Sequence, residues 1–236
     1  MTSKQILDEL KKMGSENIKK ILLKHGAKEP FYGIKVEDLK KLQKTIKENQ
    51  QQLALELFAS GVGDAQYLAG LMADGSKMNT KELQAWAEKA GWQMISEYSV
   101  AWVASENKEA WDLAIKWIDS PKPNVASSGW ATLGCIVATK MDEELNIAAL
   151  KKLLARVEKE IHKAPARVSY CMNSFVIAVG SYVKELTQTA IDTGKKNGVV
   201  TIDMGGTACK IPFAPDFINK VKLRGSIGKK KKTAKC

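Results

Sequence analysis

Basic side chains are the most abundant groups in this chain that could do chemistry, and phosphate is the group they would bind. The 236 residues include 37 Lys and Arg against 26 Asp and Glu, a formal net charge of +11. From Ile218 to the end, eight residues are basic and none is acidic, which leaves 29 basic and 26 acidic residues in the rest. Such a lysine run is typical of a solvated face, a localisation signal or a nucleic-acid arm.

Other basic residues flank expected helix ends and a turn, where long side chains can reach phosphates. We expect a flexible C-terminal tail to add affinity without selectivity, because mobile lysines respond only to phosphate charge. Residues beside the turn, being ordered, would set which nucleic-acid shape is preferred. The candidates for phosphate contact are Arg156, Lys163, Arg167, Lys195, Lys196, Lys210, Lys229, Lys230, Lys231 and Lys232.

Residues 109–139 indicate the kind of element that would position these groups: two helices joined by a tight corner. Apolar residues recur at three- and four-residue steps, and Pro121 and Pro123 end the first helix because proline lacks the N–H that a helix interior needs. Asn124 is placed to cap the second helix. That helix contains small residues suited to close helix packing, namely Ser127, Ser128, Gly129, Ala131 and Gly134.

A second unit of the same form occupies residues 150–180, offset by 43 residues from the first. HEAT and armadillo repeats have periods of about 40 to 47 residues. The sequence therefore predicts an all-α fold, a HEAT-like or armadillo-like superhelix. The alternative is an irregular helical domain without true repeats.

One segment departs from the helical pattern. Residues 199–202 have strand character, Gly205 and Gly206 suit a turn, and residues 208–211 would return, so a β-hairpin is expected at about 199–211. It would either reach for a partner or close the end of the superhelix. We expect one repeat domain over residues 1–222 and a basic tail over residues 223–236.

The chain offers little for metal or membrane chemistry. The two histidines and four cysteines have no zinc-ligand spacing, and no apolar run approaches the roughly 18 residues of a membrane span. The first residues form an amphipathic, charged segment instead of a signal peptide. We expect a cytoplasmic, reduced monomer with no metal and no cofactor.

The connector FYGIKVEDLKKLQK, the Trp-rich centre and the order of helices between Phe31 and Tyr182 resemble the DNA alkylation repair family, the AlkD-like alkylpurine DNA glycosylases. The resemblance implies a curved α-solenoid whose concave, basic face holds duplex DNA. The expected hairpin and the lysine tail would make this chain a divergent branch of that family.

The resemblance also implies an active site, which this chain matches poorly. The family has a tryptophan followed four residues later by a catalytic aspartate, and here Trp92 is followed by Ser96, with Glu97 one position further. The family's arginine falls on Ser128, and its last tryptophan falls near Phe175. A carboxylate stabilises the positive charge that forms on the sugar when an N-glycosidic bond breaks, and a serine hydroxyl does not.

Three functions remain open from the sequence. The first is a DNA-binding protein that recognises backbone shape, such as branched or distorted DNA, without excising bases. The second is an active alkylpurine glycosylase that uses Glu97 in place of the aspartate. The third is a protein-binding scaffold, a common use of α-solenoids. Trp92 would stack on a base in the first two, or belong to the core.

Overall fold

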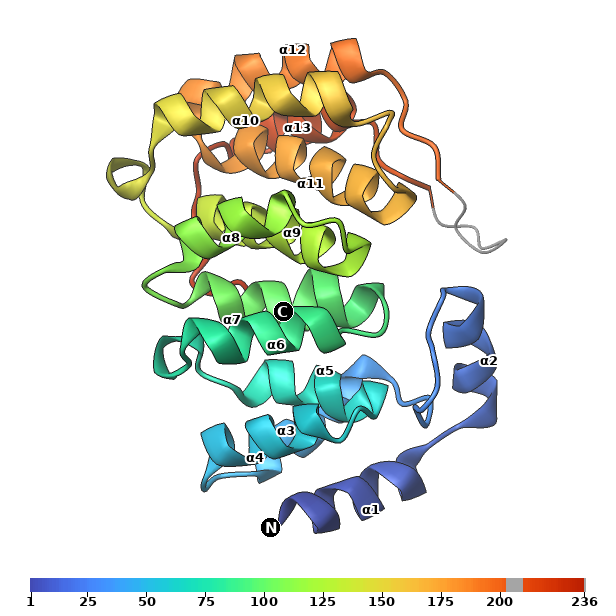
Figure 1. Ribbon diagram of the computed structural model, residues 1–236. Coiled ribbons are helices and arrows are strands. Elements are labelled where there is room, and N and C mark those ends of the chain that lie inside the picture. Colours follow the sequence, from blue (N-terminus) through green and yellow to red (C-terminus); the bar gives the residue numbers. More distant parts are fainter. Residues whose placement is uncertain (203–209, 236) are drawn as a thin grey trace.

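The computed structural model describes residues 1–202 and 210–235, and they form a stack of helices with no strand among them (Figure 1). The predicted all-α fold is therefore confirmed. The α-helices of the first half are α1 (Ser3–Met13), α2 (Glu16–Lys24), α3 (Val36–Thr45), α4 (Gln50–Ala59), α5 (Gly63–Met72), α6 (Thr80–Lys89) and α7 (Ala101–Ser105). Those of the second half are α8 (Ala110–Ile118), α9 (Pro123–Thr139), α10 (Ile147–Glu160), α11 (Ala166–Tyr182), α12 (Thr187–Asn197) and α13 (Ala214–Leu223).

Short helical turns complete these elements. The π-helical segment η2 (Ile95–Val100) runs directly into α7, so that the two form one helix. The 3₁₀ turns are η1 (Gly75–Lys77), η3 (Asp142–Glu144) and η4 (Lys184–Leu186).

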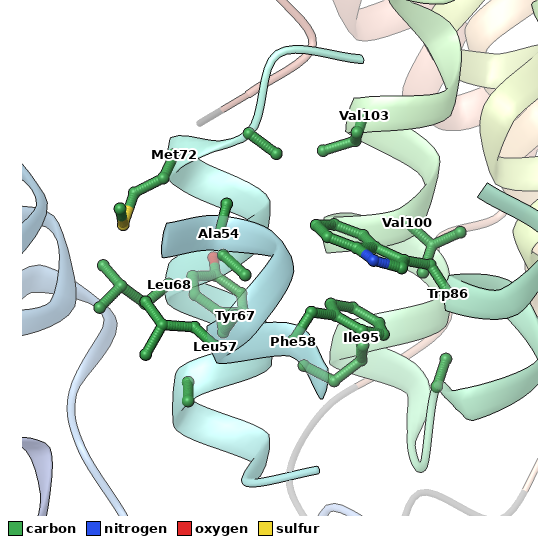
Figure 2. Packing of buried hydrophobic residues seen from close by; sticks show 14 of the residues in the cluster. Ala54, Leu57, Phe58, Tyr67, Leu68, Met72, Trp86, Ile95, Val100 and Val103 are labelled. Atoms are coloured by element: carbon green, nitrogen blue, oxygen red, sulfur yellow. The ribbon is translucent and has the colours of Figure 1, made fainter. Parts of the chain in front are cut away.

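The helices pair into two rows (Figure 1). The inner row consists of α5, the η2–α7 helix, α9, α11 and α13, and each member packs on the next. The outer row consists of α4, α6, α8, α10 and α12. Within it, the rings of Phe58 and Trp86 stack on each other (Figure 2), and their centroids are 3.9 Å apart. Further along, the indole of Trp117 donates to the Gln84 side chain at 2.8 Å.

The hydrophobic core follows the stack in two adjoining clusters. The first joins the N-terminal helices through residues such as Phe58, Leu68 and Trp86 (Figure 2), and the second joins the helices from α8 onward around Trp130 and Phe175. Trp130 and Phe175 lie on neighbouring inner helices with their ring centroids 5.3 Å apart. Because each helix pair buries its apolar faces against the next pair, the stack is what makes the core continuous.

Local sequence signals account for several helix boundaries. Thr2 and Asn79 form capping boxes at the starts of α1 and α6, as their spacing to Gln5 and Glu82 predicts. The prediction for Asn124 is wrong: α9 begins at Pro123, which suits the first helical position because its missing N–H has no partner there. The Asn124 amide instead donates to carbonyls at the end of α6, at 2.8 and 3.2 Å.

The connector before α3 is held by one buried carboxylate. Asp64, in α5, accepts hydrogen bonds from the backbone N–H groups of Tyr32 at 2.5 Å and Ile34 at 2.9 Å. Between them, Gly33 has φ +81°, and a Cβ there would lie 2.6 Å from the backbone nitrogen of Lys19. Only glycine fits at position 33, because any side chain would clash with the backbone of Lys19.

The β-hairpin is not supported. Residues 199–202 and 210–211 lie in no strand, and the expected turn at Gly205 and Gly206 lies outside the described residues. After α12, Gly198 has φ +63° and redirects the chain. Val200 is then buried in the second core cluster, while Val199 stays exposed. The strand-like residues of this segment therefore reflect one buried side chain. That burial comes from packing against the core and requires no strand.

Candidate nucleic-acid interface

The amino-terminal ends of the inner helices bring together the two positions at which the resemblance expects Asp and Arg. Ser96 lies in η2 and Ser128 in α9, and both are buried. The Ser128 hydroxyl donates to the backbone carbonyls of Ser96 at 2.8 Å and Asn124 at 2.9 Å. The two positions are therefore neighbours in space, but the groups that occupy them are hydroxyls committed to backbone carbonyls.

A buried ion pair lies beside them. Arg167, at the start of α11, donates from Nε to one oxygen of Glu97 at 2.7 Å and from Nη2 to the other oxygen. The Glu97 side chain is 3% exposed and that of Arg167 29%. The guanidinium also lies over the Tyr170 ring, 4.2 Å from its centroid. The pair connects η2 to α11 across α9, and its forked geometry is the strongest arrangement for a carboxylate and an arginine.

The electrostatics of this pair follow from burial. Burial raises the pKa of the Glu97 carboxyl, and the hydrogen bonds and positive charge of Arg167 oppose that rise. Burial alone would lower the pKa of Arg167, but the hydrogen bonds and charge of Glu97 outweigh it and raise that pKa. Each partner thus stabilises the charged form of the other, and Glu97 is not free to act as a base.

Between the inner helices and the C-terminal tail lies a cavity of about 610 Å³, which we call the aromatic pocket. Its walls come from η2–α7, α9, α11, α13 and the tail. The rings that line it belong to Tyr98, Trp102, Trp130, Tyr170, Phe175, Tyr182 and Phe217. Glu97 lies at one end of this pocket, and the side chains of Arg224, Lys229 and Lys231 lie on its tail side.

The tail runs back along the carboxy-terminal ends of the inner helices (Figure 1). The backbone N–H of Gly228 donates to the carbonyl of Ser181 at 2.9 Å, at the end of α11. The N–H of Lys231 donates to the carbonyl of Ala138 at 2.8 Å, near the end of α9. Ala234 reaches the first core cluster. The tail thus crosses the inner row from α13 to α7.

Two tail lysines are held by the ends of these helices. Lys230 donates to the carbonyl of Val137 at 2.9 Å and pairs with Asp142 at 2.8 Å. Lys235 donates to the carbonyl of Ala73 and pairs with Glu106 at 3.0 Å. Their side chains are only 10% and 19% exposed. A cation is stabilised at a helix C-terminus because the backbone carbonyls carry partial negative charge there. The expectation of a flexible tail is therefore wrong.

Residues 6–197 match the family described as DNA alkylation repair enzyme. The chain belongs to the DNA alkylation repair family. A protein of Listeria innocua, described as uncharacterised, is 30% identical over 229 residues, covering 95% of this chain and 99% of that one. A Listeria monocytogenes protein with the same description is 29% identical over equal coverage.

A solved structure is also similar over the whole chain. It superposes with a TM-score of 0.90 at 33% identity and covers 100% of both chains. It is described as a new family of proteins related to the HEAT-like repeat DNA glycosylases with affinity for branched DNA structures. The HEAT-like fold is therefore confirmed, and so is the resemblance to the DNA alkylation repair family.

Within this member of the family, Trp92 and Arg156 lie in structural contacts. Trp92 is buried beside Phe31, with ring centroids 6.4 Å apart, and belongs to the first core cluster. Arg156 pairs with Asp119 at 2.7 Å and Glu160 at 2.8 Å, which ties α10 to α8 in the outer row.

The remaining candidates for phosphate contact differ in how they are partnered. Lys196 pairs with Glu158 at 3.1 Å, and Lys195 lies 3.8 Å from Asp192 while remaining exposed. Of the candidate lysines, those that are exposed and have no ion pair among the described residues are Lys163, Lys210, Lys229, Lys231 and Lys232.

Sequence reasoning did not find the aromatic pocket or the partner of Arg167. Tyr98 and Tyr170 follow Glu97 and Arg167 by one and three residues, and this proximity is the only signal that could have pointed to them. Among the described residues, no three His, Cys, Asp or Glu side chains lie together in a way that could hold a metal ion. No helix in the described part of the chain is long and apolar enough to cross a membrane.

Proposed function

We infer that this protein binds DNA through the phosphate backbone, prefers branched or distorted DNA, and does not excise bases. The preference follows the solved neighbour, which belongs to a family described as having affinity for branched DNA structures. The exposed lysines supply the charge that phosphate binding needs, because each neutralised phosphate releases condensed counterions.

The main support for the expected lack of base excision is the Glu97–Arg167 pair. Glu97 is the carboxylate nearest to the position of the expected aspartate, and both of its oxygens accept hydrogen bonds from the partly buried guanidinium of Arg167. Ser96 and Ser128 occupy the positions of the expected aspartate and arginine, and their hydroxyls bond to backbone carbonyls. A carboxylate neutralised in this way adds little stabilisation to a developing sugar cation.

The test is a base-release assay on methylated duplex DNA with an active alkylpurine glycosylase as positive control. We expect no release of 3-methyladenine or 7-methylguanine. Excision that is abolished by Glu97→Gln would show that Glu97 is catalytic and would overturn this part of the proposal.

Binding is tested separately by titrating salt against a linear duplex and a three-way junction of equal length. We expect tighter binding to the junction and a steep fall of affinity with salt for both. No binding to either DNA at low salt would favour the scaffold function instead. The cytoplasmic location and monomeric state stay predictions, and sedimentation of the protein with and without junction DNA would test the latter.

A further inference from the structure

We propose that the aromatic pocket holds one unpaired nucleobase of the bound DNA, with the adjacent phosphate on the lysines of the tail. This proposal rests on the proposed function, because it assumes that DNA is bound. It adds that the protein reads an unstacked nucleotide as well as the shape of the backbone.

The first argument is size and lining. A cavity of about 610 Å³ falls within the range of about 300 to 1,000 Å³ that small-molecule sites have. Tyr98, Tyr170 and Tyr182 line it, and they come from two inner helices. Every base has a π-face, so such rings hold unpaired bases with little dependence on sequence.

The second argument is that the interior carries little charge. Burial raises the pKa of the Cys135 thiol to about 12 and raises the pKa of the Cys171 thiol, so both are neutral. Burial also raises the pKa of Tyr98 and Tyr170, so their hydroxyls keep their protons. The charge of Glu97 is balanced by Arg167. A neutral, aromatic interior suits an uncharged nucleobase, and it offers no unpaired charge that would bind an ionic group.

The third argument is the position of the cations. Arg224, Lys229 and Lys231 line the tail side of the pocket and are exposed to solvent. Lys231 lies over the Tyr182 ring, 5.7 Å from its centroid, so that one edge combines a ring with a positive charge. A nucleotide has this same division, an uncharged aromatic base joined to an anionic phosphate. A fatty acid also joins an apolar part to an anion, but it has no flat ring to match the aromatic walls.

The test compares three DNA duplexes: one fully paired, one with a single bulged thymidine, and one with a bulged abasic nucleotide of the same backbone. Binding to backbone shape alone predicts equal affinity for the two bulges. A base in the pocket predicts that the thymidine bulge binds about tenfold or more tightly than the abasic bulge, since stacking on aromatic side chains contributes about five- to 150-fold per base.

Gly134 offers a matched pair of variants to link this preference to the pocket. It lines the pocket from α9, and a Cβ built on it would meet only the Cβ of Ala178, at 3.8 Å. Gly134→Trp should fill the pocket and abolish the tenfold preference, while Gly134→Ala should keep it. Ala178→Trp fills the pocket from α11 and replaces Gly134→Trp if that variant does not fold.

Each outcome decides the proposal. Loss of the preference in both Trp variants, with unchanged binding to the paired duplex, supports it. Equal affinity for the two bulges overturns it while leaving the proposed function intact. Absence of binding to every DNA overturns the proposed function as well. Binding of free thymidine monophosphate that Gly134→Trp removes, without any bulge preference, would mean that the pocket takes a free nucleotide. A fatty acid that copurifies with the protein and is lost in Gly134→Trp would identify a different ligand.

Discussion

Charged side chains are paired at both ends of the inner helices, but with different consequences. At the amino-terminal ends, Glu97 and Arg167 form a forked pair, one residue beyond the position at which the family resemblance expects a catalytic carboxylate. At the carboxy-terminal ends, Lys230 and Lys235 bond to helix carbonyls and to acidic residues on the same side. The first pair occupies a carboxylate that could otherwise react, and the second set withdraws two lysines from the proposed DNA-binding surface.

The comparison shows that only charged side chains without a partner inside the molecule should be counted as available to a ligand. The tail contains five lysines from Lys229 onward, but two of them are held inside the molecule, and three remain exposed. Net charge indicates the class of partner, whereas the partners of each side chain determine how many charges reach it.

Arg167→Met should have the largest effect on stability. It leaves the Glu97 carboxylate buried and unpaired, and removing one partner of a buried pair costs about 3 to 5 kcal/mol. Urea unfolding followed by circular dichroism measures the loss. The double variant Glu97→Met with Arg167→Met is the control, and it should recover much of the stability because no unpaired charge remains.

The same variant should respond to pH. Burial raises the pKa of Glu97, and without Arg167 the largest effect that opposes this rise is gone, leaving only the side-chain hydrogen bond with Cys171. A carboxyl with a raised pKa in the folded state is most stabilising when protonated, so the deficit should shrink as the pH falls from about 8 to about 5. A deficit that stays constant over this interval would show that the loss comes from packing and not from the buried charge.

Removing residues 228–236 should have the next largest effect. The deletion breaks the backbone bonds of Gly228 and Lys231 and the pairs of Lys230 and Lys235. Hydrogen bonds contribute roughly 0.5 to 1.5 kcal/mol each, and the regained chain entropy offsets part of this, so we expect a net loss of about 2 kcal/mol. Thermal unfolding measures it. A tail that is only a DNA arm would leave the melting temperature unchanged.

A pair of lysine variants should separate the two uses of the tail. Replacing Lys229, Lys231 and Lys232 by alanine should lower the slope of log K against log salt by about 2.7, at about 0.9 per phosphate contact on duplex DNA. Replacing Lys230 and Lys235 should leave the slope almost unchanged and lower stability instead. Equal losses of slope per lysine in the two variants would mean that the pairs open when DNA binds.

How much of this could be read from the sequence depends on the distance over which each feature is formed. Capping boxes at Thr2 and Asn79 and the helical stripes are local, and they were predictable. The Glu97–Arg167 pair joins residues 70 positions apart, and no pattern along the chain specifies it. The prediction of a flexible tail is wrong for the same reason, because the carbonyls that bind its lysines belong to helices far away in sequence.

Two glycines of α9, Gly129 and Gly134, cannot be told apart from the sequence, but their surroundings in the structure differ. Substituting them should have the smallest effect on stability of the changes considered. Both suit close helix packing by composition, but only Gly129 is packed closely: a Cβ there would lie 2.8 Å from the backbone nitrogen of Ile118 and 2.9 Å from the carbonyl of Ala114. At Gly134 a Cβ meets one methyl group at ordinary contact distance and otherwise faces the aromatic pocket.

Gly134→Ala should therefore raise the free energy of unfolding by about 0.5 to 1 kcal/mol, since alanine is the better helix former. Gly129→Ala should lower it, because the backbone of α8 cannot move away without disturbing the outer row. Chemical denaturation of the two variants measures both signs. If Gly134→Ala is destabilising, α9 and α11 are more tightly packed beside Ala178 than the cavity implies.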